Sequence, residues 1–400
     1  MTREAWLAIG TVAWAALLVA LPVVALVRGR RARRATWPPA LLPARRLVVR
    51  PCAGASPWLA DALWSTGGAV GLTGASVWFT VDDPGDPAWP IASEVAMRLR
   101  AAGLDATAVV AAWPGTNRKA AQLVAAARSA LDQGTEPRRL EIAVADADVC
   151  LDGVDLDLLC AGLSDPGVGA TWKAVVENRG ETPADAASSA LLGASLHAFP
   201  LLGRLDGGGL VGKLFAFDAG RASAADALSA GLEVLGEDVA LAAALSDRGL
   251  RVVQLAGAEV SVVRGRVPEA VLSRYTRWVH VVRSQRPGRL WCYPVLFLGP
   301  WGLAIGGAAA CISAPVEGLA AIALAVLVRV FTGWVAVSLS GRTLAPSFVD
   351  LARADALLFR AWLGALRSSE VVWAGHRLRR QEGARWAPAP LAPMPPEGRP

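Results

Sequence analysis

The sequence carries little charge for its length. Asp, Glu, Lys and Arg make up 18% of its 400 residues, 54% are hydrophobic, and the mean hydropathy is +0.40. An average soluble domain has about 25% charged residues, so this chain is too apolar to be a plain soluble globule. Intrinsic disorder is also excluded, because it requires low hydrophobicity together with high net charge.

Cysteine and lysine are scarce as well. The five cysteines have no Cys-x-x-Cys spacing, which excludes a disulfide scaffold and a cysteine zinc site and fits a reducing compartment. None of the three histidines has the spacing of a metal site. The only lysines are Lys119, Lys173 and Lys213, so basic character rests almost entirely on arginine.

The longest uncharged run near the start covers Ala5 to Val27. As a helix it is about 35 Å long, enough to cross the hydrocarbon core of a bilayer. A cleaved signal peptide would carry its positive charge before the apolar run, whereas here five arginines follow it, between Arg28 and Arg34. This order predicts an uncleaved anchor with the following chain in the cytoplasm. Without interleaved aromatic residues the arginines do not indicate a nucleic-acid partner, and we expect none.

Two further apolar runs, Leu290 to Val316 and Gly318 to Ser340, predict a transmembrane hairpin joined by a loop at Ser313 to Gly318. Arg329 interrupts the second run and should face a partner helix, a headgroup or a cavity. Phe348 to Leu366 mixes charged and large apolar residues, which is typical of a helix lying in the interface, although a crossing stays open.

These features divide the chain into five parts. We expect a multi-pass protein of the cell (inner) membrane whose catalytic part faces the cytoplasm. The parts are a transmembrane anchor with a basic linker (1–46), a cytoplasmic block (47–288), a transmembrane hairpin (289–341), an interfacial helix with a basic segment (342–385) and a proline-rich disordered tail (386–400).

The cytoplasmic block alternates strand-like and helix-like stretches, which predicts an α/β fold with a parallel sheet. The expected strands are Ser76–Val81, Ala106–Ala112 and Leu140–Ala145, and the expected helices are Pro87–Ala102 and Asn117–Gln133. Ligands of such sheets bind at the carboxyl ends of the strands, where this chain has two acidic clusters, Asp82-Asp83 and Asp146-Ala147-Asp148.

The spacing of Asp146 and Asp148 suits one hard divalent cation that keeps water and phosphate oxygens as further ligands. Turns are rich in aspartate, so the pair alone is weak evidence. Glu237-Asp238 opens a predicted helix, where two acids either stabilise the helix dipole or include a general base.

Arg274, Arg277 and Trp278 lie in a predicted helix from Pro268 to Gln285. Arginines three residues apart share a helix face, where they could bind a diphosphate or anionic lipid headgroups.

In this order, the motifs resemble those of the membrane-anchored ceramide glucosyltransferases and their bacterial relatives, including hopanoid-associated glycosyltransferases. These are inverting enzymes of the family 2/21 type with a GT-A fold (a Rossmann-like nucleotide-diphospho-sugar transferase). The similar motifs cover roughly residues 47 to 290, and the segment from Ala170 to Gly220 matches poorly. The motifs are Pro51–Pro57, Thr80–Ala88, Gly115–Lys119 with Gln122-Leu123, Ala145–Val149, Glu237-Asp238 and Arg274-x-x-Arg277-Trp278.

The resemblance implies transfer of a sugar from a UDP-sugar, of the glucose or N-acetylglucosamine type, to the hydroxyl of a membrane lipid such as ceramide or a hopanoid. It also implies a role for each motif residue. Asp83 and Lys119 would bind the donor, Asp146 and Asp148 would hold Mg²⁺ or Mn²⁺, Asp238 would be the catalytic base, and Arg274, Arg277 and Trp278 would grip the diphosphate.

Two other functions stay open. A processive polysaccharide synthase would need more membrane helices than the three predicted here. A catalytically inactive, membrane-tethered GT-A binding protein would have no physical need for clustered carboxylates that repel one another.

Overall fold

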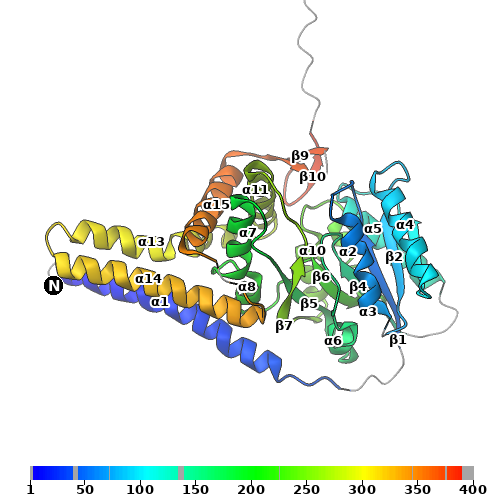
Figure 1. Ribbon diagram of the computed structural model, residues 1–400, viewed down its shortest axis with the longest axis horizontal. Helices are drawn as coiled ribbons and strands as arrows, with labels where there is room; N and C mark the ends of the chain where they lie inside the picture. Colours follow the sequence, from blue (N-terminus) through cyan, green and yellow to red (C-terminus); the bar gives the residue numbers. More distant parts are fainter. Residues whose placement is uncertain are drawn as a thin grey trace, which may run out of the picture.

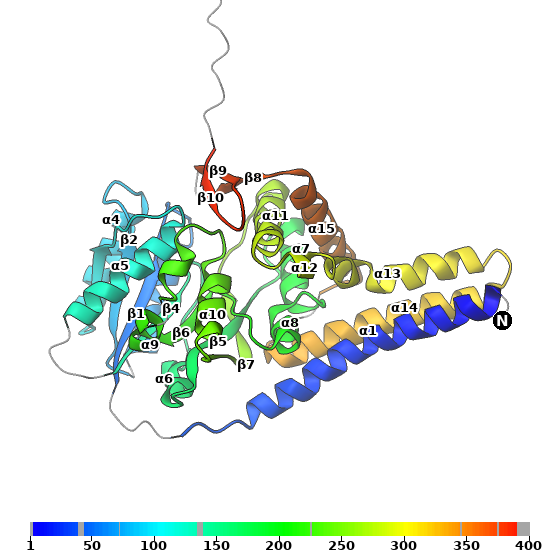
Figure 2. The same ribbon diagram turned by 180° about the vertical axis from the view of Figure 1, so that it is seen from behind.

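A computed structural model describes residues 3–38, 44–71, 73–133, 139–224, 226–344, 346–373 and 376–389. It has two parts, a sheet covered by helices and a group of three long helices at one end (Figure 1). Figure 2 shows that α1, α13 and α14 also lie together when seen from behind, with the N-terminus at their far end.

The central sheet has seven strands in the order β3-β2-β1-β4-β6-β5-β7. β6 is antiparallel to both of its neighbours, and the other pairs are parallel, so the predicted parallel sheet is mixed at one point. The strands are β1 (Ala44–Pro51), β2 (Ser76–Val81), β3 (Ala106–Val110), β4 (Arg139–Ala145), β5 (Val168–Glu177), β6 (Leu214–Asp218) and β7 (Arg251–Ser261).

Short apolar runs, such as Leu47–Val49 of β1 and Ile142–Ala145 of β4, explain why these strands are central. Residues Val48 and Val49 of β1 are almost fully buried on opposite faces, in two separate core clusters. Strands buried on both faces of a parallel sheet lose the alternation of apolar and polar residues. The five strands and helices predicted between residues 76 and 133 and at 140–145 are confirmed to within two residues.

Helices cover both faces of the sheet and fill the segments between strands. They are α2 (Leu59–Trp64), α3 (Thr66–Val70), α4 (Ala88–Ala101), α5 (Arg118–Asp132), α6 (Leu156–Ala161), α7 (Pro183–Gly193), α8 (Phe199–Asp206), α9 (Ala219–Ala224), α10 (Glu237–Asp247), α11 (Pro268–Gln285) and α12 (Pro287–Leu290).

Among the described residues, three stretches of helix are long and apolar enough to cross a membrane, as the sequence predicts: Ile9–Arg33, Pro287–Ala310 and Pro315–Ser340. The first belongs to α1 (Arg3–Arg33), the second covers α12 and α13 (Tyr293–Ala310), and the third is α14 (Pro315–Ser340). The hairpin turn therefore comprises residues 311–314 and is shorter than the predicted Ser313–Gly318 loop, because Pro315 begins α14 at a position where proline is favoured.

α1 continues past Val27 through the arginine-rich segment. The guanidinium groups of Arg28 and Arg33 donate hydrogen bonds to the carbonyls of Arg204 (2.8 Å) and Ser338 (2.6 Å). These contacts attach the end of α1 to α8 and to the end of α14. The part that contains the sheet is thus joined directly to the long helices.

The helix predicted at Phe348–Leu366 is α15 (Phe348–Arg367), which packs against α7 and α11. Ser347 caps its first turn. Arg329 of α14 faces this helix and pairs with Asp355 at 3.1 Å, while the indole N–H of Trp301 donates to the same carboxylate at 3.0 Å. The predicted partner-helix contact of Arg329 is therefore present.

The C-terminal region differs from the prediction of disorder after Trp386. Residues Trp386–Pro388 form β10, which pairs with β9 (His376–Arg380), and β9 pairs with β8 (Glu370–Trp373). The predicted basic segment is thus a strand. Trp386 is 1% exposed, and burial of its large indole explains why a proline-rich segment is ordered here. Residues 390–400 of the predicted tail lie outside the described part.

Candidate active site

A cavity of about 1830 Å³ opens at the carboxyl ends of β2 and β4. All of the site residues predicted from the sequence line it. They are Asp83, Lys119, Asp146, Asp148, Asp238, Arg274, Arg277 and Trp278. Residues separated by almost 200 positions in the sequence therefore come together in one place.

Asp83 lies in the loop between β2 and α4, is exposed, and lines this cavity. Its Oδ1 accepts a hydrogen bond from the backbone N–H of Gly85 (2.8 Å). The neighbouring carboxylates Asp82 and Asp86 both pair with Arg118, and that of Asp86 also accepts the N–H of Gly54 (2.7 Å). Asp82 and Asp86 hold the loop, whereas Asp83 is left facing the cavity.

Lys119 connects the second acidic motif with the third. Asn117 caps α5, which places Lys119 in the first turn of that helix. The ammonium group of Lys119 lies 2.6 Å from Asp146, 2.9 Å from Glu237 and 2.6 Å from the carbonyl of Gly212. These anions outweigh the burial that would lower the pKa of Lys119, so its pKa is raised and the group is a fixed positive charge.

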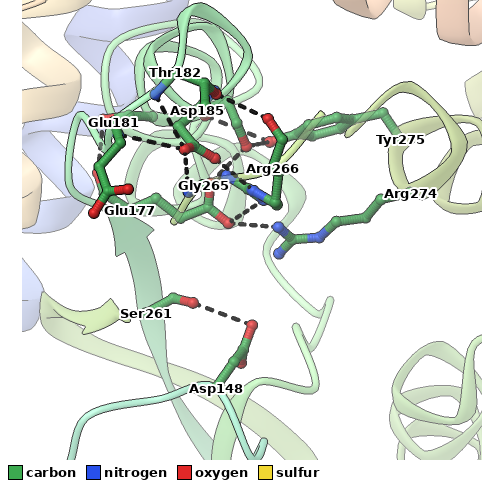
Figure 3. A network of polar contacts seen from close by, with 12 residues as sticks. Asp148, Glu177, Glu181, Thr182, Asp185, Ser261, Gly265, Arg266, Arg274 and Tyr275 are labelled. Carbon is green, nitrogen blue, oxygen red and sulfur yellow. Dashed lines mark hydrogen bonds and ion pairs between the residues drawn. The ribbon is translucent and has the colours of Figure 1, made fainter. Parts of the chain in front are cut away.

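Asp148 is held by Lys213 and Ser261, as Figure 3 shows for the serine. Its Oδ2 lies 2.5 Å from the Lys213 ammonium and accepts the Ser261 hydroxyl at 3.1 Å. Its Oδ1 is buried and has no hydrogen-bond partner among the described residues. Burial opposes ionisation of Asp148, but Lys213 and Arg274 lower its pKa.

The two carboxylates of Asp146 and Asp148 fit a divalent cation whose remaining coordination positions are filled by a bound ligand and water. No three His, Cys, Asp or Glu side chains of the described residues form a full metal site. Asp146 and Asp148 supply two carboxylates, and the unpaired buried Oδ1 of Asp148 is the kind of atom that a cation would satisfy. Mg²⁺ is typically bound through one or two carboxylates plus phosphate and water oxygens.

Arg274 is fixed by an anion that the sequence analysis missed. Its Nη1 lies 2.5 Å from Oε1 of Glu177, at the end of β5, and its guanidinium lies 4.6 Å from the ring centre of Trp278. Arg266 also binds Glu177, as Figure 3 shows. Burial opposes ionisation of Glu177, yet both arginines lower its pKa. Nη2 of Arg274 is buried without a partner among the described residues, which leaves a donor for a ligand.

Asp238 opens α10 and is positioned by two backbone N–H groups. Its Oδ2 accepts from Gly212 (2.7 Å) and its Oδ1 from Val239 (2.8 Å). Burial and the adjacent charge of Glu237 raise the pKa of Asp238 to about 6, against the effect of Lys119. A carboxylate with that pKa is ionised at neutral pH and is still basic enough to accept a proton.

The other end of the cavity is apolar. It is lined by Trp278 of α11, a predicted site residue, and by residues of α8, α13 and the loop before α8, where the sequence carries no recognisable motif. These further residues are His197, Phe199, Leu202, Leu205, Tyr293 and Leu296. His197 is 4% exposed, neither ring nitrogen has a partner among the described residues, and burial lowers its pKa to about 4. At the rim, Asp206 pairs with both Arg286 (3.0 Å) and Arg289.

The chain as a whole is similar to known proteins. The model of glycosyl transferase family 21 matches residues 12–386. A mannosyltransferase from Pyrobaculum calidifontis, solved with GDP-mannose and Mn²⁺, is 18% identical, with 89% of this chain and 97% of that chain covered and a TM-score of 0.52. Glucosyl-3-phosphoglycerate synthase from Mycobacterium tuberculosis is 14% identical, with 65% and 81% covered and a TM-score of 0.36. No curated protein matches. The predicted α/β GT-A fold is confirmed.

Proposed function

This chain belongs to glycosyl transferase family 21, and we propose that it transfers a sugar from a UDP-sugar to the hydroxyl group of a membrane lipid. The single observation that carries the proposal is the set of residues that line the cavity. Its charged end has acids and bases suited to a nucleotide diphosphate, and its other end is formed by apolar residues of α8 and of the membrane-crossing candidate α13. One cavity can thus bind a water-soluble donor and an acceptor that stays in the bilayer.

At the charged end, Asp83 would bind the nucleotide, and Asp146 with Asp148 would hold Mg²⁺ or Mn²⁺. When bound, such a cation supplies Lewis-acid stabilisation of the departing diphosphate. Arg274 and Arg277 would bind the negative charge of the same diphosphate. Nη2 of Arg274 has no partner among the described residues and can donate to it. Lys119, fixed by Asp146 and Glu237, would keep the carboxylate cluster ionised near the donor phosphates.

At the junction of the two ends, Asp238 would act as general base. A lipid hydroxyl attacks the anomeric carbon of the sugar, its proton passes to the Asp238 carboxylate, and the bond from that carbon to the diphosphate oxygen breaks. Attack from the side opposite the leaving group inverts the anomeric configuration. Two backbone N–H groups already orient the carboxylate, so little reorganisation is needed at the moment of reaction.

The distribution of charged and exposed apolar residues supports a cavity that opens on the cytoplasmic side of the cell membrane. Exposed arginines at the end of α1, such as Arg30 and Arg31, follow the apolar part of the helix, as the positive-inside rule requires of a cytoplasmic flank. The outer face of α15 exposes Phe348, Val349 and Phe359. We place this face at the headgroup level, where it would hold the cavity mouth against the lipid.

Substitutions in α13 test the lipid route. Leu296 lines the apolar end, whereas Leu298, on the same helix, is 44% exposed and does not line the cavity. We expect Leu296→Trp to reduce transfer to lipid about tenfold or more by overfilling the acceptor end, with UDP affinity unchanged. Leu298→Trp is the matched control and should behave like the wild type. Equal transfer by the wild type and Leu296→Trp would contradict an acceptor at this end.

A further inference from the structure

The sheet β8–β10 is anchored on the catalytic part although it follows all three membrane-crossing candidates in the chain. The backbone N–H of Trp386 donates to the carbonyl of Glu233 (2.9 Å), and its buried indole lies edge-on to His280 at 5.4 Å between ring centres. Trp386, Leu235, Val371 and Leu378 form a small core of their own. Figure 1 shows β9 and β10 beside α11. This core attaches the sheet to the loop that leads into α10.

The anchored sheet also forms a wall of the active-site cavity. Trp373, His376, Arg377 and Leu378 line the cavity together with Asp238. The sheet is therefore more than a C-terminal extension, because its residues face the same space as the candidate base.

Within that wall, Trp373 lies against Arg277. The Arg277 guanidinium is 5.3 Å from the ring centre of Trp373, and it has no hydrogen bond or ion pair with any residue in the described part of the chain. Arg274, one helical turn earlier, is held both by Glu177 and by the ring of Trp278. Arg277 thus depends on an aromatic face for its position, and all of its N–H donors are left for a ligand.

We propose that Trp373 is a positioning residue that holds the Arg277 guanidinium toward the diphosphate of the donor, which makes the C-terminal sheet part of the donor site. This inference rests on the proposed function. A cation held over an aromatic face is attracted to the ring quadrupole without giving up its hydrogen-bond donors. An acidic partner would instead neutralise the charge that must attract the diphosphate. An aromatic wall therefore suits an arginine that has to bind an anion.

Isothermal titration with UDP and Mn²⁺, without acceptor, tests the proposal on the full-length protein in nanodiscs. We expect Trp373→Leu to weaken UDP binding about 2- to 30-fold and Trp373→Phe to restore most of the affinity. Val372→Leu is the matched control, since Val372 is the residue before Trp373 in β8, is 55% exposed and does not line the cavity. Its UDP affinity should equal that of the wild type.

A double-mutant cycle separates positioning from a general effect on structure. In an Arg277→Met background, Trp373→Leu should cause no further loss of UDP affinity. As a single substitution, Trp373→Leu should raise the KM for the donor by a larger factor than it lowers kcat. Additive losses, or wild-type UDP affinity in Trp373→Leu, would overturn the proposal and leave the proposed function intact. A wild-type protein that does not bind UDP would instead overturn the proposed function.

Discussion

The ammonium group of Lys213 lies 2.5 Å from Oδ2 of Asp148, a carboxylate proposed to hold the divalent cation. Lys213 therefore neutralises part of the charge that would attract the metal. We expect Lys213→Met to tighten Mn²⁺ binding in the presence of UDP by about tenfold or more, since a like charge a few ångströms away is removed.

Asp148→Asn should weaken Mn²⁺ binding, because it removes a carboxylate ligand. Calorimetric titration measures the Mn²⁺ affinity of both variants. Activity should be lost in excess EDTA and return with Mn²⁺ or Mg²⁺. Full activity in EDTA, or unchanged Mn²⁺ affinity in both variants, would show that these carboxylates do not hold a cation.

The raised pKa of Asp238 predicts an acidic limb in the pH profile. Burial and Glu237 raise this pKa to about 6, and only the ionised carboxylate can accept a proton. We expect kcat/KM to fall as the pH drops through about 6. Glu237→Gln removes the repelling charge and should move the limb to lower pH. A profile that is flat down to pH 5, or a limb that Glu237→Gln does not move, would contradict this assignment.

The pair Arg329–Asp355 predicts an asymmetric response in stability. Both side chains are less than 10% exposed, and Arg329 also donates to the carbonyl of Ala194 (2.6 Å). Removing one partner leaves a buried charge, so Asp355→Leu should cost about 3–5 kcal/mol of stability. Combining it with Arg329→Leu should restore most of the loss. Thermal unfolding in nanodiscs measures both, and a double variant less stable than Asp355→Leu would contradict the explanation.

Reporter insertions test the orientation. A reporter fused after Arg46 should be cytoplasmic, and one inserted at Ser313, in the turn between α13 and α14, should be external. The arginines after Val27 are the physical reason, because positively charged flanks stay in the cytoplasm. Export of the first reporter would separate the active site from cytoplasmic UDP-sugar.

The sequence predicted those parts of the site that local patterns determine. Asp146 and Asp148 follow a strand that ends in the apolar run Ile142–Ala145, and the topology of a parallel sheet places such residues at the ligand-binding edge. Glu177 was missed because it ends a strand with no motif around it, and only folding brings it to Arg274. The same applies to His197 and Leu296, which reach one cavity only because folding brings the loop before α8 to the start of α13, where the rings of His197 and Tyr293 lie 5.7 Å apart.

The C-terminal sheet could not be predicted for a related reason. A proline-rich segment such as this one has too few apolar residues to form a core by itself. Trp386 becomes ordered only because Leu235 and His280, more than a hundred residues earlier, provide a surface for its indole. A non-local contact therefore outweighed the local composition.

Transfer of labelled sugar from UDP-sugar to lipid by the purified protein, compared between the wild type and Asp238→Asn, tests the central claim most directly. The substitution keeps the shape of the side chain and removes the proton acceptor. We expect the wild type to produce a labelled lipid, and Asp238→Asn to lose about two to four orders of magnitude in turnover, with UDP affinity little changed and a smaller loss in Glu237→Gln. Near-normal turnover in Asp238→Asn, or a wild-type protein that binds UDP with Mn²⁺ but transfers sugar to no lipid, would contradict the account.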